Sequence, residues 1–382
     1  CNLAPELAGE SHRRACHRPA VEVSIEGIQG IQPIHRVDPV QRLRTAPTNP
    51  LLQVRDLQVG FPVRSGDWPW SRGVTLRAVR GLSFDLRAGE TLGVVGESGC
   101  GKSTLGRCLL RLIEPTSGSV RFDGTELVGL SERALRPMRS RMQMVFQDPF
   151  ASLNPRLRVR DIIGEALDTH GIAQNRRSER IGELLEMVGL QKAHADRFPH
   201  EFSGGQRQRI GIARALAVEP KLIIADEPVS ALDVSVQAQV LLLLRELRAR
   251  RGLAFLFVSH DLSVVRWFCD SVAVMYLGRI VEQGPVAEVL RAPLHPYANM
   301  LRDASPEPDP SRRGILPRII GEIPSAAAPP SGCAFHPRCG AGLAECARIV
   351  PPLAPLSGGR AVACHLYSPI SGKPLRTTQT QI

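Results

Sequence analysis

Residues 91–104 read Thr-Leu-Gly-Val-Val-Gly-Glu-Ser-Gly-Cys-Gly-Lys-Ser-Thr, and this stretch decides the fold. Its first five residues, 91–95, are mostly apolar and predict a short buried strand. The glycine-rich run that follows is typical of a loop whose backbone N–H groups surround a phosphate, and the helix expected over 103–113 adds the positive field of its N-terminus. Strand, glycine loop and helix in this order predict a phosphate site in a layered α/β domain.

The nine loop residues are all predicted to bind ATP: Gly96, Glu97, Ser98, Gly99, Cys100, Gly101, Lys102, Ser103 and Thr104. Lys102 is expected to reach the β- and γ-phosphates, and Ser103 offers its hydroxyl to Mg²⁺. Asp226 follows a strand predicted over 222–225 and is expected to hold the water shell of the same ion. A tight structural turn is the alternative, and the full match in its strand–loop–helix context disfavours it.

Three further residues are predicted to be catalytic. Glu227 directly follows Asp226 and is the expected general base, which orients and polarises the attacking water. His260 follows a strand predicted over 254–258 and can hydrogen-bond the γ-phosphate, with an ordinary surface histidine as the alternative. Gln147 lies where the core meets a helical region, so its amide is expected to ligate Mg²⁺ and to sense the position of that region.

A second segment, Phe-Ser-Gly-Gly-Gln at 202–206, predicts another helix end that binds phosphate. Ser203 is suited to be the N-cap, and Gly204, Gly205 and Gln206 supply free N–H groups in the first turn. A helical region separates this end from the first loop, so the two cannot meet on one γ-phosphate. We therefore expect a dimer that closes on ATP, in which this end contacts the nucleotide of the other subunit.

The chain divides into three predicted parts. Residues 1–48 mix Pro, Gly, Arg and His without periodicity or a secretory signal, which predicts a flexible extension. Residues 49–290 predict the nucleotide domain, with a helical subdomain at about 132–206. Residues 291–382 are Pro-rich and predict a small appended domain.

Within the nucleotide domain, a first strand is expected near Leu51 and a loop over 61–73. Residues 76–86 predict two strands around a turn at Gly81, and helices are expected over 162–170, 181–188 and 234–250.

Composition excludes several classes of protein. With 43% hydrophobic and 22% charged residues, the 382-residue chain is an ordinary globular one, and no apolar run approaches the roughly 18 to 20 residues of a membrane span. Any membrane role therefore needs a partner. The net charge of +11 comes from scattered arginines without a dense basic block, so no nucleic acid partner is expected. The uneven spread of nine cysteines indicates a reducing compartment.

Over about residues 51–290 these motifs resemble the ATP-binding subunits of ABC transporters. The matches are 96–104 with Walker A, 202–206 with the signature, and 226–227 with Walker B and the catalytic carboxylate. Gln147 matches the Q-loop, residues 230–233 with Asp233 match the D-loop, and His260 matches the switch histidine. The signature begins with Phe202 where the family usually has Leu, at a packing position. The resemblance implies a P-loop NTPase fold of the ABC cassette type with a helical insertion, and an ATPase activity.

The resemblance also implies an aromatic residue that stacks on adenine. Phe61 is the best match, and Trp68 and Trp70 are the alternatives because the expected loop after Phe61 is long.

Residues 198–206, 229–239 and 295–297 resemble the oligopeptide/dipeptide importers more narrowly, and Ser230 favours their F-type subunit. This resemblance implies peptide import at the cytoplasmic face of the inner membrane, as a peripheral subunit. The implied partners are a second related ATPase or a second copy of the chain, two membrane permeases and, indirectly, an extracytoplasmic peptide-binding protein. The alternative is a soluble ABC-type ATPase that acts on nucleic acid or ribosomes, which the basic charge favours slightly. The chain has one cassette and no sustained heptads, which favours the transport function over this alternative.

Four cysteines of the C-terminal part, Cys333, Cys339, Cys346 and Cys364, have the spacing C-x5-C-x6-C-x17-C. Four soft ligands can hold a tetrahedral metal or an iron–sulfur cluster. The segment is similar to one that is associated with a [4Fe-4S] cluster in the resembling family, and zinc or unligated thiols are the alternatives. Three other cysteines are expected to be packing residues: Cys100, Cys108 and Cys269.

Overall fold

The computed structural model describes residues 49–64, 73–305 and 321–367. The expected N-terminal extension lies outside these ranges, and so do Trp68 and Trp70. The described residues belong to one compact unit. In the described part of the chain, no helix has both the length and the apolar character that a membrane crossing requires.

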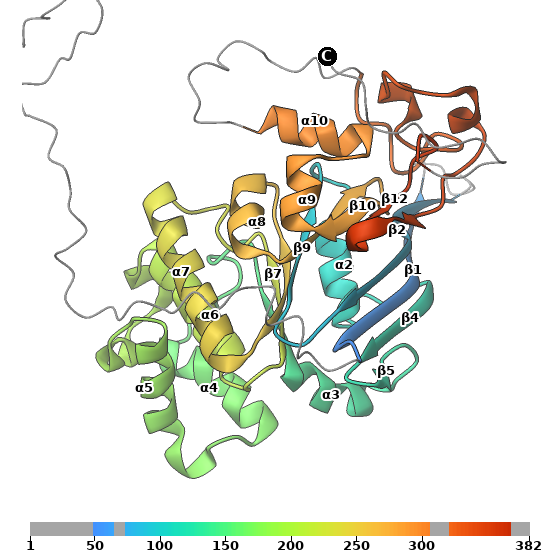
Figure 1. The fold of residues 1–382 in the computed structure, drawn as a ribbon. Coiled ribbons are helices and arrows are strands. Elements are labelled where there is room, and N and C mark those ends of the chain that lie inside the picture. Colours follow the sequence, from blue (N-terminus) through green and yellow to red (C-terminus); the bar gives the residue numbers. More distant parts are fainter. Residues whose placement is uncertain (1–48, 65–72, 306–320, 368–382) are drawn as a thin grey trace, which may run out of the picture. The chain divides into compact units, whose positions relative to one another are not determined.

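An eight-stranded sheet forms the centre of this unit, in the order β11-β12-β10-β9-β3-β8-β7-β6 (Figure 1). In this order, each pair of neighbouring strands from β9 through β3, β8 and β7 to β6 is parallel. Strand β10 is antiparallel to β9. The bounds are β3 Thr91–Val95, β6 Met142–Val145, β7 Leu222–Asp226, β8 Ala254–Val258, β9 Ser271–Tyr276 and β10 Arg279–Pro285. The α/β class and the strands predicted over 91–95, 222–225 and 254–258 are confirmed.

The central strands are buried on both faces, because each face packs against its own hydrophobic cluster. In β7, Ile223 and Ala225 belong to one cluster, and Leu222 and Ile224 belong to the other. Side chains alternate between the two faces of a strand, so a continuous apolar run is what a strand covered on both sides requires.

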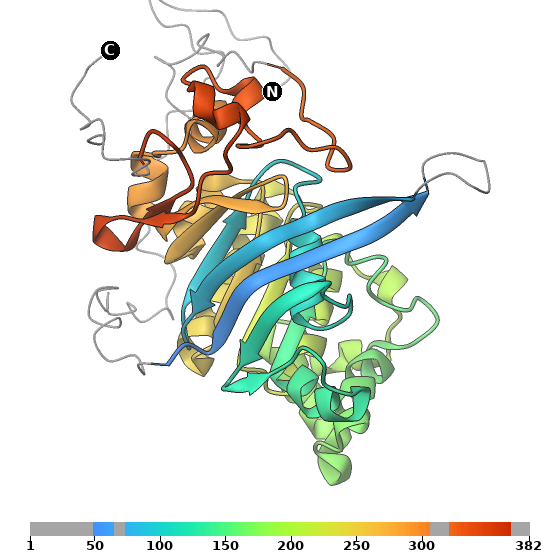
Figure 2. The same cartoon turned by 90° about the vertical axis from the view of Figure 1, so that its right-hand side faces the viewer.

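A second, antiparallel sheet has the order β2-β1-β4-β5, with β1 Leu52–Arg64, β2 Gly73–Leu86, β4 Ser117–Phe122 and β5 Thr125–Glu126. Figure 2 shows β1 and β2 as a long pair of strands. Two predictions were wrong here. Phe61 lies inside β1 instead of opening a loop, and Gly81 lies inside β2 instead of in a turn between two strands. Gly81 has φ +79° where the register with β1 shifts, and such an irregularity bends a strand without ending it.

The helices of the first half are α2 Lys102–Leu109, α3 Glu132–Arg141, α4 Val159–His170 and α5 Arg177–Met187. Those of the second half are α6 Gly204–Leu216, α7 Val234–Arg251, α8 Leu262–Phe268, α9 Val286–Arg291 and α10 Pro296–Ala304. Short 3₁₀ helices occupy Gln174–Arg176, Lys192–Asp196, Pro199–Glu201, His336–Arg338, Ala344–Ala347 and Ser357–Gly359. The helices predicted over 162–170, 181–188 and 234–250 are present, whereas α2 is shorter than the predicted 103–113.

The region predicted as helical from residue 132 onward contains a core strand. Residues 142–145 form β6, which pairs in parallel with β7 at the edge of the large sheet. The sequence analysis placed these residues in the helical subdomain and did not predict the strand, because a run of four residues is too short for its periodicity to distinguish strand from helix.

The part after residue 290 continues the large sheet. Strands β11 (Ala354–Pro355) and β12 (Ala361–Val362) pair with each other, and β12 pairs with β10. An ion pair of 2.6 Å between Arg360 and the fully buried Glu282 strengthens this junction. A separate domain over 291–382 stays a prediction.

Candidate nucleotide site

A cavity of about 700 Å³ brings together ten of the predicted site residues. Four of the segments that line it follow the carboxyl ends of β3, β6, β7 and β8, which meet at one edge of the parallel sheet. The lining residues are Phe61, Leu76, Ala78, Ser98, Gly99, Gly101, Lys102, Ser103, Thr104, Gln147, Glu227, Ser230, Ala231 and His260. Leu76 and Ala78 were not predicted, because nothing in the pattern of β2 distinguishes them from other strand residues.

The glycine loop after β3 lies tightly against β2. Gly101 precedes α2 with φ +104°, and a Cβ atom there would lie 2.2 Å from the carbonyl oxygen of Ala78. Only glycine combines this φ with so close an approach. The loop therefore keeps its backbone against the strand while its next residues enter α2.

Lys102 is buried in the loop. Its Nζ donates hydrogen bonds to the carbonyl oxygens of Gly96 at 2.7 Å and of Glu97 at 3.0 Å. These two carbonyls hold an ammonium group beside the N-terminus of α2, so two sources of positive potential face the same cavity.

Ser103 and Asp226 connect α2 to the end of β7. The Ser103 hydroxyl donates to Asp226 Oδ1 at 2.9 Å. Burial raises the pKa of Asp226, and this hydrogen bond opposes the rise. A divalent cation would offset the cost of burying the carboxylate, and hydroxyl and carboxylate oxygens are the ligands that Mg²⁺ prefers. The residues present therefore fit Mg²⁺.

Glu227 contacts both of the other predicted catalytic residues. Its Oε2 accepts a hydrogen bond from Gln147 Nε2 at 3.1 Å and lies 3.2 Å from His260 Nδ1. Its backbone is in the left-handed region, with φ 45°, and its N–H donates to the carbonyl of Val258. A residue held in this costly conformation with its carboxylate between an amide and an imidazole is typical of a functional site.

Comparisons with known proteins agree with this geometry. Residues 79–230 match the ABC transporter family, and residues 281–346 match the oligopeptide/dipeptide transporter C-terminal region. The chain is 53% identical over 320 residues to the probable peptide ABC transporter ATP-binding protein y4tS of Sinorhizobium fredii, covering 84% of this chain and 90% of that protein. The chain belongs to the ABC transporter ATP-binding family. Its residues 281–346 match a C-terminal region that is typical of oligopeptide and dipeptide transporters.

Other relatives of this ABC ATPase extend the comparison. It is 52% identical over 324 residues to the oligopeptide transport ATP-binding protein AppF of Bacillus subtilis, covering 83% of this chain and 98% of that protein. A solved dimeric structure of the ATP-binding cassette MJ0796, bound to ADP and Pi, is 27% identical with a TM-score of 0.54, covering 62% of this chain and 98% of that one. The cassette fold and the assignment as an ATPase are thereby shown.

The segment predicted to be the signature of this ABC ATPase lies outside the cavity. Ser203 caps α6, since its Oγ accepts from the Gln206 N–H at 3.3 Å and Gln206 Oε1 accepts from the Ser203 N–H at 3.1 Å. Neither these residues nor Gly204 and Gly205 line the cavity, and the same holds for Asp233, the N-cap residue of α7.

Three loop residues predicted to bind nucleotide are also absent from the lining of the cavity. Gly96, Glu97 and Cys100 do not line the cavity, and the thiol of Cys100 is buried. The carboxylate of Glu97 instead pairs with Arg338, a contact that sequence reasoning missed because 241 residues separate the two.

The four C-terminal cysteines lie near one another without forming a ligand set. Cys346 and Cys364 are buried, and burial together with the neighbouring thiols raises the pKa of Cys364 to about 12. Among the described residues, no group of three or more His, Cys, Asp or Glu side chains could hold a metal ion. The predicted iron–sulfur cluster or zinc site on Cys333, Cys339, Cys346 and Cys364 is therefore not supported. Cys100, Cys108 and Cys269 are packing residues, as predicted.

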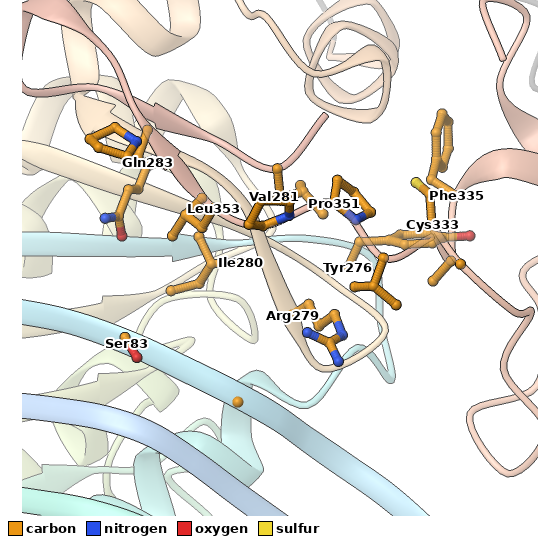
Figure 3. A pocket seen from close by; sticks show the side chains of 18 residues that line it. Ser83, Tyr276, Arg279, Ile280, Val281, Gln283, Cys333, Phe335, Pro351 and Leu353 are labelled. Carbon is orange, nitrogen blue, oxygen red and sulfur yellow. The ribbon is translucent and has the colours of Figure 1, made fainter. Parts of the chain in front are cut away.

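A second cavity, of about 470 Å³, lies between β2, β10 and the C-terminal segment (Figure 3). Cys333 is the one predicted site residue in its lining. Tyr276, Cys333 and Phe335 lie at one end of it, and Gln283 and Ser83 lie toward the other.

Proposed function

We propose that this ABC ATPase powers the import of peptides through partner membrane permeases. The observation that carries the catalytic part is the meeting of Gln147, Glu227 and His260 in the cavity that the phosphate loop bounds. The C-terminal match and the names of the relatives at 50–53% identity support the peptide substrate.

The proposed mechanism assigns one task to each group. Lys102 and the N-terminus of α2 bind the negative charge of the phosphates, and Phe61 stacks on the adenine. Glu227 accepts a proton from the attacking water through the oxygen that also contacts His260. His260 then donates to the γ-phosphate and holds the water in line. Mg²⁺, bound through Ser103, Gln147 and Asp226, would neutralise charge that develops on the phosphates.

We also propose that two subunits complete each site. Ser203–Gln206 form a capped helix end outside the cavity of their own chain, and the N–H groups of Gly204 and Gly205 in its first turn are not used by the cap. A second copy or a related ATPase can place its own such end over the open side of the cavity. The MJ0796 cassette, a relative in fold, is dimeric with ADP and Pi bound, which supports an assembly of two subunits.

Replacing Ser203 by alanine tests the shared site. We expect at least about a tenfold loss of ATP turnover, because one charge-assisted contact to the partner's γ-phosphate is lost, and unchanged ATP affinity of the isolated chain. The matched control is Ser131→Ala, which removes the N-cap serine of α3. Both variants lose about 1 kcal/mol of helix capping. Equal turnover in the two variants would contradict the shared site.

The peptide substrate requires a test in the membrane, where we place the subunit peripherally at the cytoplasmic face. We expect the tagged chain to purify together with two permeases, and its ATP turnover in proteoliposomes to rise when a peptide-loaded binding protein is added. Purification with RNA or ribosomes, and turnover that responds to them instead, would favour the nucleic acid alternative.

A further inference from the structure

We propose that Arg338, in the C-terminal segment, positions the phosphate loop through Glu97 and so sets the affinity for ATP. This inference rests on the proposed nucleotide site. It adds to that site a residue that lies far from the cassette motifs in sequence.

The contact is a two-pronged ion pair. Arg338 Nη1 lies 2.9 Å from Glu97 Oε2, and Nη2 lies 3.0 Å from Oε1. The Arg338 side chain is 2% exposed and that of Glu97 is 20% exposed. Two parallel hydrogen bonds between planar groups fix both distance and orientation, which a single contact at the surface would not do.

Glu97 is also held by its backbone. Its N–H donates to the Tyr297 hydroxyl at 2.8 Å, and its carbonyl accepts from Lys102 Nζ at 3.0 Å. Glu97 therefore contacts both Arg338 and Lys102, the lysine that is expected to bind the phosphates.

Aromatic side chains also hold the guanidinium group of Arg338. Its guanidinium lies 5.9 Å from the ring of Tyr276 and 5.8 Å from that of Phe335, and Nη1 contacts the Tyr276 hydroxyl at 3.4 Å. The ring centroids of Tyr276 and Tyr297 are 4.6 Å apart, and Phe335 lies 5.3 Å from Tyr276. Arg338 Nη2 also contacts Met300 Sδ in α10 at 3.8 Å, so Arg338 connects β9 and α10 to the loop from its place in the C-terminal segment. Figure 3 shows Tyr276 and Phe335 close to Cys333.

Charge gives this pair a second effect. Glu97 places a carboxylate in the loop that is to receive a polyphosphate, and Arg338 neutralises it. A buried ion pair adds little net stability, whereas removal of one partner leaves an uncompensated charge. Loss of Arg338 should therefore both release Glu97 and leave its negative charge to repel ATP.

The test compares full-length variants by ATP binding and by steady-state turnover. We expect Arg338→Met to raise the Kd and KM for ATP about tenfold, with kcat within about twofold, because Glu227, Gln147 and His260 are untouched. Arg338→Lys should recover part of the affinity, since it restores the charge without the two-pronged geometry. The double variant Arg338→Met with Glu97→Gln should bind ATP more tightly than Arg338→Met alone.

Arg360→Met is the matched control. It removes a half-buried arginine that also joins the C-terminal part to the core, through Glu282 and without contact to the loop. Both single variants should unfold at a lower temperature, and only Arg338→Met should lose affinity for ATP. Equal ATP affinities in the two variants would overturn the proposal. Failure of the unaltered chain to bind ATP would contradict the proposed function itself.

Discussion

Replacing Glu227 by glutamine is expected to lower ATP turnover by at least about 100-fold and to leave ATP binding intact. Glutamine keeps the shape and the hydrogen-bonding reach toward Gln147 and His260, which lie 3.1 and 3.2 Å from Oε2. It cannot accept a proton from water at neutral pH. The change therefore removes the base and retains the cavity.

The measurements are phosphate release, equilibrium ATP binding and size-exclusion chromatography with ATP. In the proposed shared site, bound ATP holds the two subunits together and hydrolysis removes its γ-phosphate, so the variant should accumulate as an ATP-bound dimer. Glu246→Gln on α7 is the control, because this carboxylate pairs with Arg250 away from the cavity. Turnover near the normal rate in Glu227→Gln would show that another group is the base.

Replacing Lys102 by methionine is expected to weaken ATP binding by at least about 100-fold, which corresponds to about 2.7 kcal/mol. Methionine retains most of the apolar stem and removes the ammonium group. That group donates to two loop carbonyls in the structure and is placed to donate to phosphate oxygens when ATP is bound.

Lys192→Met is the control, since Lys192 is a largely exposed lysine that pairs with Glu186. Thermal unfolding without nucleotide should show that both variants are folded. Addition of ATP should then raise the unfolding temperature of Lys192→Met and leave that of Lys102→Met unchanged. Stabilisation of both variants by ATP would contradict the assigned role of Lys102.

Local sequence predicted the elements that form the site. The apolar run over 91–95, the glycines after it and the helix that follows are neighbours in the chain, so their pattern predicted the strand, the tight loop and the helix end. The same holds for Asp226 and Glu227 at the end of β7 and for the Ser203 cap of α6. Elements that depend on long-range pairing were predicted less well. β6 became a strand because β7 offered it an edge, and β2 stayed continuous through Gly81 because β1 pairs along it.

The sequence by itself therefore determined a nucleotide-binding α/β fold and the residues expected to contact the phosphates, because these depend on propensity, periodicity and glycine conformation. Only the tertiary structure decided that Gln147 and His260 meet at one oxygen of Glu227, and that Arg338 holds Glu97 across 241 residues. It also turned Glu97 away from the cavity and left the four cysteines without a metal-binding arrangement among the described residues. The physical reason is that the order of strands in the sheet and the packing of the C-terminal segment bring these groups together, and neither is encoded in any local stretch of the chain.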